Sequence, residues 1–461
     1  MLSNLEIYRR ATTGEICSEK DFDLKRFIPA VRRLVKEHGI TYDRGTPVPS
    51  DDDLAERVWQ AGKALFLEVG VFCVDTERLI KFDELELDQA LAHAPRPVIL
   101  GTGQYAKAIP VRRPESSTPP FFSLGACGAG VTSDDVFMSL TQAYCELPYT
   151  DAIASPAMTQ VDGMTIIAGS PLEVEGCVRT VTMTREAARR ANRAGLGIAN
   201  IVPTAVTAQG NIAGSATAGG QIDIAEIGNI AELKIDFENL NKVTYAQGQG
   251  RPVLGGTGQV VGGYAGGPAG CAITLAAYHF FALLVLRAAV QHPYVSHFET
   301  QSCASREVIW VRSLALQAIT RHSDVPCLES GIYGAGPATG MSLYEAAAMA
   351  APCVVSGGSV EAGPTARATH PDYLSPMEPL FAAEVGRSVV GMSRKDVNAL
   401  VVQLLEKYEG RLADPPLGML YQDCYDIASR RPAEEALAAY KQARSDLVEM
   451  GLQFRDPPFY G

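Results

Sequence analysis

The sequence of 461 residues is poor in basic residues and lacks the local motifs of the common catalytic and metal-binding classes. Its 40 Lys and Arg residues are outnumbered by 52 Asp and Glu residues, and the net charge of −12 argues against nucleic-acid binding, which depends on basic patches. None of the ten cysteines belongs to a CxxC pair, so neither a zinc ribbon nor a thioredoxin-like redox site is indicated. Motifs of the GxSxG and HExxH types are absent, and the glycine-rich segments match neither a P-loop nor a complete dinucleotide fingerprint.

We also expect no secretory leader, and only one segment is a candidate membrane span. Residues 1–15 have no apolar core and no cleavage site, and the cysteines are typical of free thiols in a reducing compartment, so we expect a cytoplasmic protein. Residues 268–286 form an almost uncharged run of near-spanning length without a companion segment. We expect this run to form a helix that is buried in the core or at a subunit interface.

Short apolar runs that alternate with helical patterns dominate the rest of the chain. Residues 1–95 show helical spacing, and the Pro-rich stretch 110–120 is expected to form a loop. The alternation that follows implies parallel strands with helical crossovers. Helices are expected over 170–193, 220–240, 268–290, 305–321 and 340–350, and strands over 121–126, 151–157, 195–201, 242–247, 294–300, 325–331 and 352–358, while 97–101 and 252–256 compete for an eighth strand.

Eight such units would close into a (β/α)₈ barrel (TIM barrel), but an open doubly wound sheet would show the same alternation. The pattern alone therefore leaves both α/β architectures open. From about residue 374 onward the chain again shows helical spacing. We predict an N-terminal helical extension over residues 1–115, followed by the barrel with C-terminal helices over residues 116–461.

Candidate functional residues follow from the rule that parallel barrels carry their chemistry at the carboxyl ends of the strands. By the same rule Cys327 and Cys353, which begin their predicted strands, should lie at the opposite face, so no cysteine-based metal site is predicted. His297, a lone histidine within its predicted strand, is more typical of a hydrogen-bonded core residue than of a ligand. The residues selected by the rule, or by a glycine-rich stretch, are Asn200, Gln209, Asn211, Tyr264, Glu299, Gln301, Glu329, Ser330 and Ser356.

Several stretches of the chain resemble the monomethylamine methyltransferase family of methanogenic archaea. They include CSEKDFDL, EVGVFCVDTERLIKF, LGTGQYA, SDDVFM, TAQGNIAG, AELKIDFENL, GGYAGG, YGAGP and QDCYD, in the same order from about Tyr8 to about Phe454. The resemblance implies a (β/α)₈ barrel, a homo-oligomer, and transfer of a methyl group to the Co(I) corrinoid (cobalamin) of a small partner protein. No tightly bound cofactor of the chain itself is implied.

The resemblance also marks where this chain departs from the family. The archaeal enzymes carry pyrrolysine eight residues before the alanine of their AQGN motif, and the matching position here is Asn200. Asparagine cannot form the adduct through which pyrrolysine is thought to capture the amine. A family glutamate is retained as Glu226 in a region expected to be helical, whereas an acidic position becomes Gly256 and a glutamine becomes Ser330, with Glu329 as the neighbouring alternative.

These departures lead to a hypothesis about the substrate. Methyl transfer needs a good leaving group, and a quaternary ammonium carries its own activation because it leaves as a neutral amine. Such a cation needs orientation, a dry pocket and negative potential or aromatic faces. We expect Asn200 to orient a quaternary or otherwise activated amine and Glu226 to balance its charge. Further substrate contacts are expected from Gly256, Tyr264, Glu299, Gln301, Glu329, Ser330 and Tyr333.

Two other functions fit the sequence. A barrel that has lost pyrrolysine could have been recruited to different small-molecule chemistry, as a lyase or hydrolase, and would then turn over substrate without a corrinoid partner. A non-catalytic amine-binding protein would bind ligand without forming product.

Overall fold

Eight parallel strands close into a barrel in this computed structural model, which describes residues 2–93, 97–200, 206–217, 222–256 and 258–460. Ladder pairing gives the orders β11-β7-β5-β19-β18 and β12-β14-β16. The backbone N–H of Asp223 donates to Ile198 O at 3.0 Å and joins β12 to β11, and a parallel bridge between Gln291 and Cys327 joins β16 to β18. The strands are β5 (Phe122–Gly125), β7 (Ala152–Ala154), β11 (Gly197–Asn200), β12 (Ala225–Ile227), β14 (Val253–Gly256), β16 (Val290–His292), β18 (Leu328–Glu329) and β19 (Ser359–Glu361).

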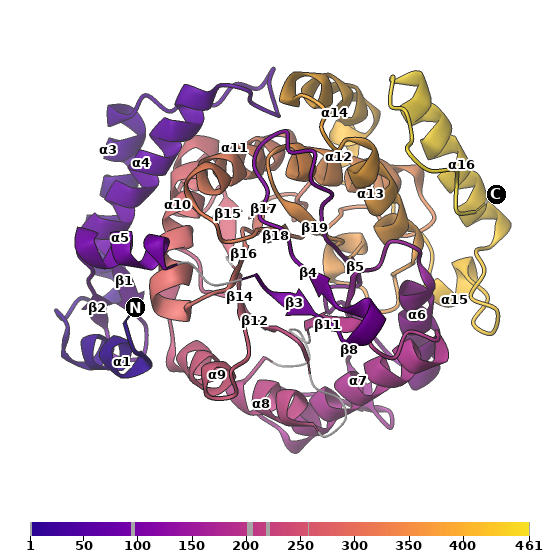
Figure 1. The fold of residues 1–461 in the computed structure, drawn as a ribbon, viewed down its shortest axis with the longest axis horizontal. Helices are drawn as coiled ribbons and strands as arrows, with labels where there is room; N and C mark the ends of the chain where they lie inside the picture. The colour runs from indigo at the N-terminus through magenta and orange to yellow at the C-terminus, as the bar shows by residue number, and fades with distance from the viewer. Residues whose placement is uncertain (1, 94–96, 201–205, 218–221, 257, 461) are drawn as a thin grey trace.

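A helix follows each of these strands, and Figure 1 shows the helices as a ring around the strands. Side-chain oxygens cap many of the helix starts; Ser133, Thr207 and Asp236, for example, each accept a backbone N–H of the first turn. The (β/α)₈ prediction is therefore confirmed. The helices are α6 (Asp134–Glu146), α7 (Pro171–Arg190), α8 (Ala208–Ala216), α9 (Phe237–Gly248), α10 (Pro268–Phe281) continued by the π-helical turn η3 (Ala282–Leu286), α11 (Arg306–His322), α12 (Gly340–Val355) and α13 (Met377–Ser388).

Several of the strand and helix predictions were wrong. Residues 242–247 lie within α9 and most of 352–358 belongs to the end of α12, because short apolar runs with β-branched residues occur in buried helices as well as in strands. Residues 294–300 contain only β17 (Val295–His297), outside the barrel ladder, and the expected helix 220–240 contains β12 and β13 (Lys234–Ile235). The eighth strand comes from residues 252–256, whereas residues 97–101 contribute β3 (Ile99–Leu100) to a hairpin with β4 (Lys107–Ala108).

The first hundred residues cover one side of the barrel. The helices α3 and α4 lie outside α10, and the C-terminal α16 lies on the opposite side of the molecule (Figure 1). Strand β1 pairs in parallel with β13, so the N-terminal segment shares a small sheet with the barrel sequence. The elements of the N-terminal segment are α1 (Asn4–Thr13), α2 (Glu19–Asp21), η1 (Phe22–Phe27), α3 (Ile28–Glu37), α4 (Asp52–Val69), β1 (Val71–Cys73), β2 (Arg78–Ile80) and α5 (Glu84–Ala92).

The remaining elements are short or C-terminal. Strands β6 (Gly130–Val131) and β8 (Ala157–Met158) extend the loops that follow β5 and β7, and β15 (Gln259–Val261) pairs with β17. The other elements are β9 (Gln160–Val161), β10 (Met164–Thr165), η2 (Gly103–Tyr105), η4 (Ala366–Ala368), α14 (Arg394–Tyr408), η5 (Glu409–Arg411), α15 (Tyr421–Cys424) and α16 (Glu434–Glu449).

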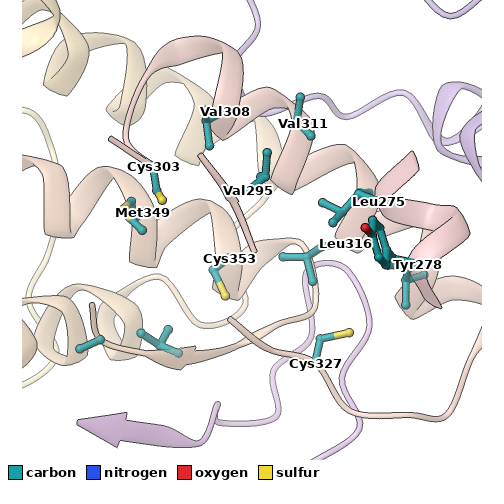
Figure 2. Close-up of a cluster of buried hydrophobic side chains, with 14 of the residues drawn as sticks. Leu275, Tyr278, Val295, Cys303, Val308, Val311, Leu316, Cys327, Met349 and Cys353 are labelled. Carbon is teal, nitrogen blue, oxygen red and sulfur yellow. The ribbon is translucent and has the colours of Figure 1, made fainter. Parts of the chain in front are cut away.

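The apolar run 268–286 forms α10 and η3, and it is the one helix in the described chain that is long and apolar enough to cross a membrane. Its most apolar window is 94% buried inside the protein. Figure 2 shows Leu275 and Tyr278 of this helix close to Leu316 of α11, within a cluster of buried apolar side chains. The segment is therefore a core helix, as the sequence predicts.

The barrel interior is layered by the two-residue repeat of its strands. Leu254, Val290 and Leu328 form an apolar layer nearer to the amino ends of the strands. Leu100 of the β3–β4 hairpin packs against this layer and helps to close that end of the barrel. Figure 1 shows β3 and β4 inside the ring of strands. Because inward-facing positions recur every second residue, the next layer holds polar or small residues at the carboxyl ends of the strands: Glu226, Gly256, His292, Ser330 and Glu361.

Candidate active site

A cavity of about 550 Å³ occupies the carboxyl end of the barrel. Glu226, His292 and Glu361 lie at its deep end, and all three side chains are largely removed from solvent. Its borders include Thr165, which is exposed, and Val206, which is 60% exposed, so the cavity runs from the buried barrel to the surface. Among its described lining residues there is no Lys or Arg. The cavity therefore has the position of a barrel-enzyme site and an excess of negative charge.

His292, at the end of β16, is the centre of a polar cluster. Its Nδ1 lies 3.0 Å from Glu226 Oε1, and its Nε2 lies 2.7 Å from Ser330 Oγ and 3.9 Å from Glu361 Oε2. Burial opposes protonation of the ring, but the negative charges of Glu226 and Glu361 outweigh it and raise the pKa of His292. The imidazole is thus fixed in orientation from two sides.

Glu361 ends β19 and is 2% exposed. Its Oε1 accepts a hydrogen bond from Ser123 Oγ at 3.3 Å, whereas its Oε2 has no hydrogen-bond partner. Burial, together with the charge of Glu226, raises the pKa of Glu361 to about 7. A buried carboxylate oxygen that lacks a donor is costly, so this atom marks a place where a cation or a proton is needed.

Cys127 borders the same cluster from the loop after β5. Its backbone has φ of 41°, a left-handed conformation that is uncommon for a residue with a side chain. Its Sγ lies 2.9 Å from Ala362 O. Burial and the charges of Glu361 and Glu226 raise the pKa of this thiol well above its ordinary value, which keeps it protonated.

Glu173, near the start of α7, holds the rim of the cavity. Its carboxylate accepts hydrogen bonds from the backbone N–H of Thr207 at 2.8 Å and from Thr207 Oγ1 at 2.9 Å. The N–H of Gly169 donates to the same carboxylate. The side chain therefore connects the loop before α7 to the start of α8.

The structure brings three of the predicted site residues together. Glu226 lies on β12, not on a helix as expected, because three residues between two turns are too few to show a strand period. Gly256 and Ser330 border the same cavity. Asn200 is the last residue of β11, where two residues of β11 are set against one of β7, and its side chain lies outside the described part of the structure.

The other predicted residues lie elsewhere. Glu329 is buried on β18 and forms an ion pair with Arg312. Tyr333 is also buried, and neither residue lines the described cavity. Glu299 and Gln301 lie on the surface, and Tyr264 is 52% exposed with Lys234 Nζ 5.9 Å from its ring centre. The sequence rule placed these side chains near strand ends but could not separate inward from outward directions.

The prediction missed His292 and Glu361. Both residues end barrel strands. The strand predicted at 294–300 lies after β16, and the strand predicted at 352–358 lies before β19, so neither prediction included the strand end that carries the residue. The dipeptides QH in VQHP and VE in GSVEAG, each directly before a Pro or an Ala-Gly pair, are the sequence features that could have indicated them.

Comparison with known proteins relates the whole chain to one family. A family model described as "Monomethylamine methyltransferase MtmB" matches residues 2–452. Monomethylamine methyltransferase MtmB1 of Methanosarcina barkeri is 30% identical and MtmB of Methanosarcina mazei 32% identical, each over 97% of this chain and 98% of the relative. The crystal structure of Methanosarcina barkeri MtmB and that of a hydroxylamine MtmB complex each superpose with a TM-score of 0.95 at 30% identity, covering 98% of both chains.

Proposed function

Because the chain belongs to the monomethylamine methyltransferase MtmB family, we propose that it moves a methyl group from a small methylated amine to the Co(I) corrinoid of a small partner protein. The observation that carries the proposal is the cavity at the carboxyl end of the barrel. Three carboxylates, those of Glu173, Glu226 and Glu361, border it, and no Lys or Arg does so among the described residues. Such a cavity favours a positively charged ligand.

The reacting amine is one whose C–N bond is already activated. During the transfer this bond breaks and nitrogen keeps both bonding electrons, while the corrinoid of the partner supplies the nucleophile that takes the methyl group. A quaternary ammonium leaves as a neutral tertiary amine, whereas neutral methylamine would leave as a strongly basic anion. We therefore propose a quaternary or otherwise activated amine as the substrate.

The residues of this chain orient the substrate and exclude water. Gly256 and Ser330 leave space at the deep end of the cavity, and the carboxylate of Glu226 contributes negative potential there. Asn200, at the pyrrolysine position, is proposed to orient the amine. The exposed rim at Thr165 and Val206 provides the opening through which a partner-held corrinoid would reach the methyl group. Binding and orienting the amine in this way needs no cofactor bound to the chain itself.

The first test is a spectroscopic assay with reduced Co(I) cobalamin, and with the cognate corrinoid protein. Methylamine, dimethylamine, trimethylamine, glycine betaine, choline, carnitine and a sulfonium are added one at a time. The expected result is enzyme-dependent loss of the Co(I) absorbance with one class of amine, reduced in Glu226→Gln and unchanged in the control Glu307→Gln. Turnover without any corrinoid would instead support a recruited lyase or hydrolase, and ligand binding without product would support an amine-binding protein.

A further inference from the structure

We propose that Glu226, His292 and Glu361 form a binding site for one divalent transition-metal ion of the Zn²⁺ class. Each residue offers one ligand atom, and these atoms all lie within 4.8 Å of one another. In the part of the chain that the structure describes, this is the only group of three or more His, Cys, Asp and Glu residues with such spacing. The proposal does not rest on the proposed methyl transfer.

The way in which the barrel presents the three side chains supports a metal site. They come from β12, β16 and β19, so three separate strands deliver them to one point at the carboxyl end of the barrel. Ligands on regular strands are held more firmly than ligands on loops, which suits the narrow distance range of metal coordination. One nitrogen and two carboxylate oxygens form a donor set that Zn²⁺ and similar ions accept.

Glu361 provides a second observation that points to a cation-binding role for the cluster. Its Oε2 is buried without a hydrogen-bond partner and lies 3.9 Å from the imidazole of His292, so it is free to bind an ion placed within the cluster. The carboxyl groups of Glu226 and Glu361 stand beside one imidazole, and a divalent cation would balance the negative charge of the carboxylates. No Lys or Arg side chain among the described lining residues is present to balance the charge of these carboxylates.

The surroundings of His292 are those of a ligand held in place. Metal-bound imidazoles donate their second ring N–H to a carboxylate, carbonyl or hydroxyl, which fixes the tautomer. Here Glu226 Oε1 lies 3.0 Å from Nδ1 and Ser330 Oγ lies 2.7 Å from Nε2, so Ser330 is the outer partner when Nδ1 faces the ion beside Glu226.

A metal ion fits this point better than the ammonium group of a substrate. A quaternary ammonium has no N–H to donate to the imidazole lone pair, and it is too bulky to lie among three ligand atoms within 4.8 Å. A metal ion with three protein ligands at the end of a cavity keeps a coordination position open for water or substrate. Catalytic zinc sites have this arrangement, whereas structural zinc sites do not.

The test is stoichiometric metal binding to the chelator-treated full-length protein. Zn²⁺ and Co²⁺ are titrated in separate experiments, followed by elemental analysis for Zn²⁺ and by visible absorption for Co²⁺. We expect one equivalent per chain. Glu361→Gln should weaken binding by more than the roughly 10- to 100-fold that the loss of an outer partner costs, and Ser330→Ala should fall within that range. Glu307→Gln, at the separate pair in which Glu307 Oε2 lies 2.9 Å from His297 Nε2, is the matched control and should bind like the unaltered protein.

A second measurement keeps the proposal testable if a variant fails to fold. Binding to the native state raises the melting temperature, so Zn²⁺ should stabilise the unaltered protein and Glu307→Gln alike. The proposal is overturned if the unaltered protein binds no stoichiometric metal, or if Glu361→Gln binds as tightly as the control. It is also overturned if methylated ammonium ions, but not Zn²⁺ or Co²⁺, raise the melting temperature. None of these readouts depends on the Co(I) assay, so a failure of the methyl-transfer proposal is seen separately.

Discussion

Gly256 shows how the absence of one side chain shapes the site. A Cβ atom added there would lie 3.4 Å from Gly228 Cα and 3.7 Å from Glu226 Oε1, which are ordinary contact distances. A larger side chain would extend beside Glu226 into the cavity. We expect Gly256→Leu to lower kcat/KM by about tenfold or more, because small displacements of a bound substrate are costly, and to change stability little.

Gly256→Ala is the matched control for this prediction and should retain most of the activity. The measurement is kcat/KM for the amine that the Co(I) assay identifies, with the free energy of unfolding from urea denaturation beside it. Full activity of Gly256→Leu would show that the substrate does not occupy this part of the cavity.

His279 predicts a pH dependence of stability that is independent of the site. The side chain is completely buried in α10, its Nε2 has no hydrogen-bond partner, and burial lowers its pKa to about 4. Below about pH 6.5 the unfolded chain binds a proton at His279 that the native state does not bind. The free energy of unfolding therefore decreases as the pH falls from 6.5 toward 4. The cost at pH 4.5, relative to pH 7, is about 2.5 kcal/mol.

The test compares urea unfolding of the unaltered protein with that of His279→Gln, which keeps a polar group near Gln291 Oε1, now 3.3 Å from Nδ1. The difference in unfolding free energy between the two proteins should shift in favour of His279→Gln on going from pH 7 to pH 4.5. A difference that stays constant over this range would mean that His279 takes up its proton at the same pH in the native and unfolded states, so that its pKa is not lowered by folding.

At the scale of elements, Glu173 joins the loop before α7 to the start of α8. Glu173→Ala would leave the N–H groups of Gly169 and Thr207 and the hydroxyl of Thr207 without their acceptor in a partly buried region. We expect a loss of about 3 kcal/mol in the free energy of unfolding and a larger KM, because the rim of the cavity loosens.

The control is Glu175→Ala on the same helix. The Glu175 side chain is 51% exposed and pairs with Arg179 one turn away, so its removal should change stability by about 0.5 kcal/mol or less. Equal effects of the two substitutions on unfolding and on KM would contradict the assigned role of Glu173.

Elements also show how far the sequence alone could predict this molecule. The strands at 121–126, 151–157, 195–201 and 325–331 are confirmed, because each is apolar, short and bounded by turn residues. β16 and β19 were missed, since VQH and SVE mix polar and apolar residues over only three positions and show no period. The apolar PCVV just before β19 belongs to a helix that contains Pro352, against its local propensity.

The failure to predict β16 and β19 decided which site residues could be found from the sequence. Glu226 and Gly256 were found from the resemblance to the family, independently of the strand positions, and Ser330 was found both from the resemblance and from the end of its predicted strand. His292 and Glu361 depended on correct strand ends, and their closeness is a product of barrel closure between segments far apart in the sequence. Spacing along the chain cannot reveal such a cluster.

At the scale of the whole molecule, the predicted N-terminal extension is closely connected to the barrel. The backbone N–H of Val48 donates to Asn398 Oδ1 at 2.9 Å, and Gln317 Nε2 donates to Pro49 O at 2.8 Å. Lys234 Nζ, between β12 and α9, lies 2.9 Å from the carboxylate of Asp23. These buried contacts predict that residues 1–115 and the barrel unfold in one cooperative transition, although they are distinct in sequence pattern.

Gly62 offers the sharpest test of this cooperativity. It lies where α4 packs on α10, and a Cβ atom added there would meet Ala276 Cβ at 2.6 Å, so Gly62→Ala forces the two helices apart. We expect a loss of about 2 kcal/mol and a calorimetric transition that remains single but moves to lower temperature. Gln60→Ala, on the exposed side of α4, should leave the transition in place. If Gly62→Ala instead splits the transition in two, the extension is a domain that folds on its own, and the barrel does not need it to cover α10.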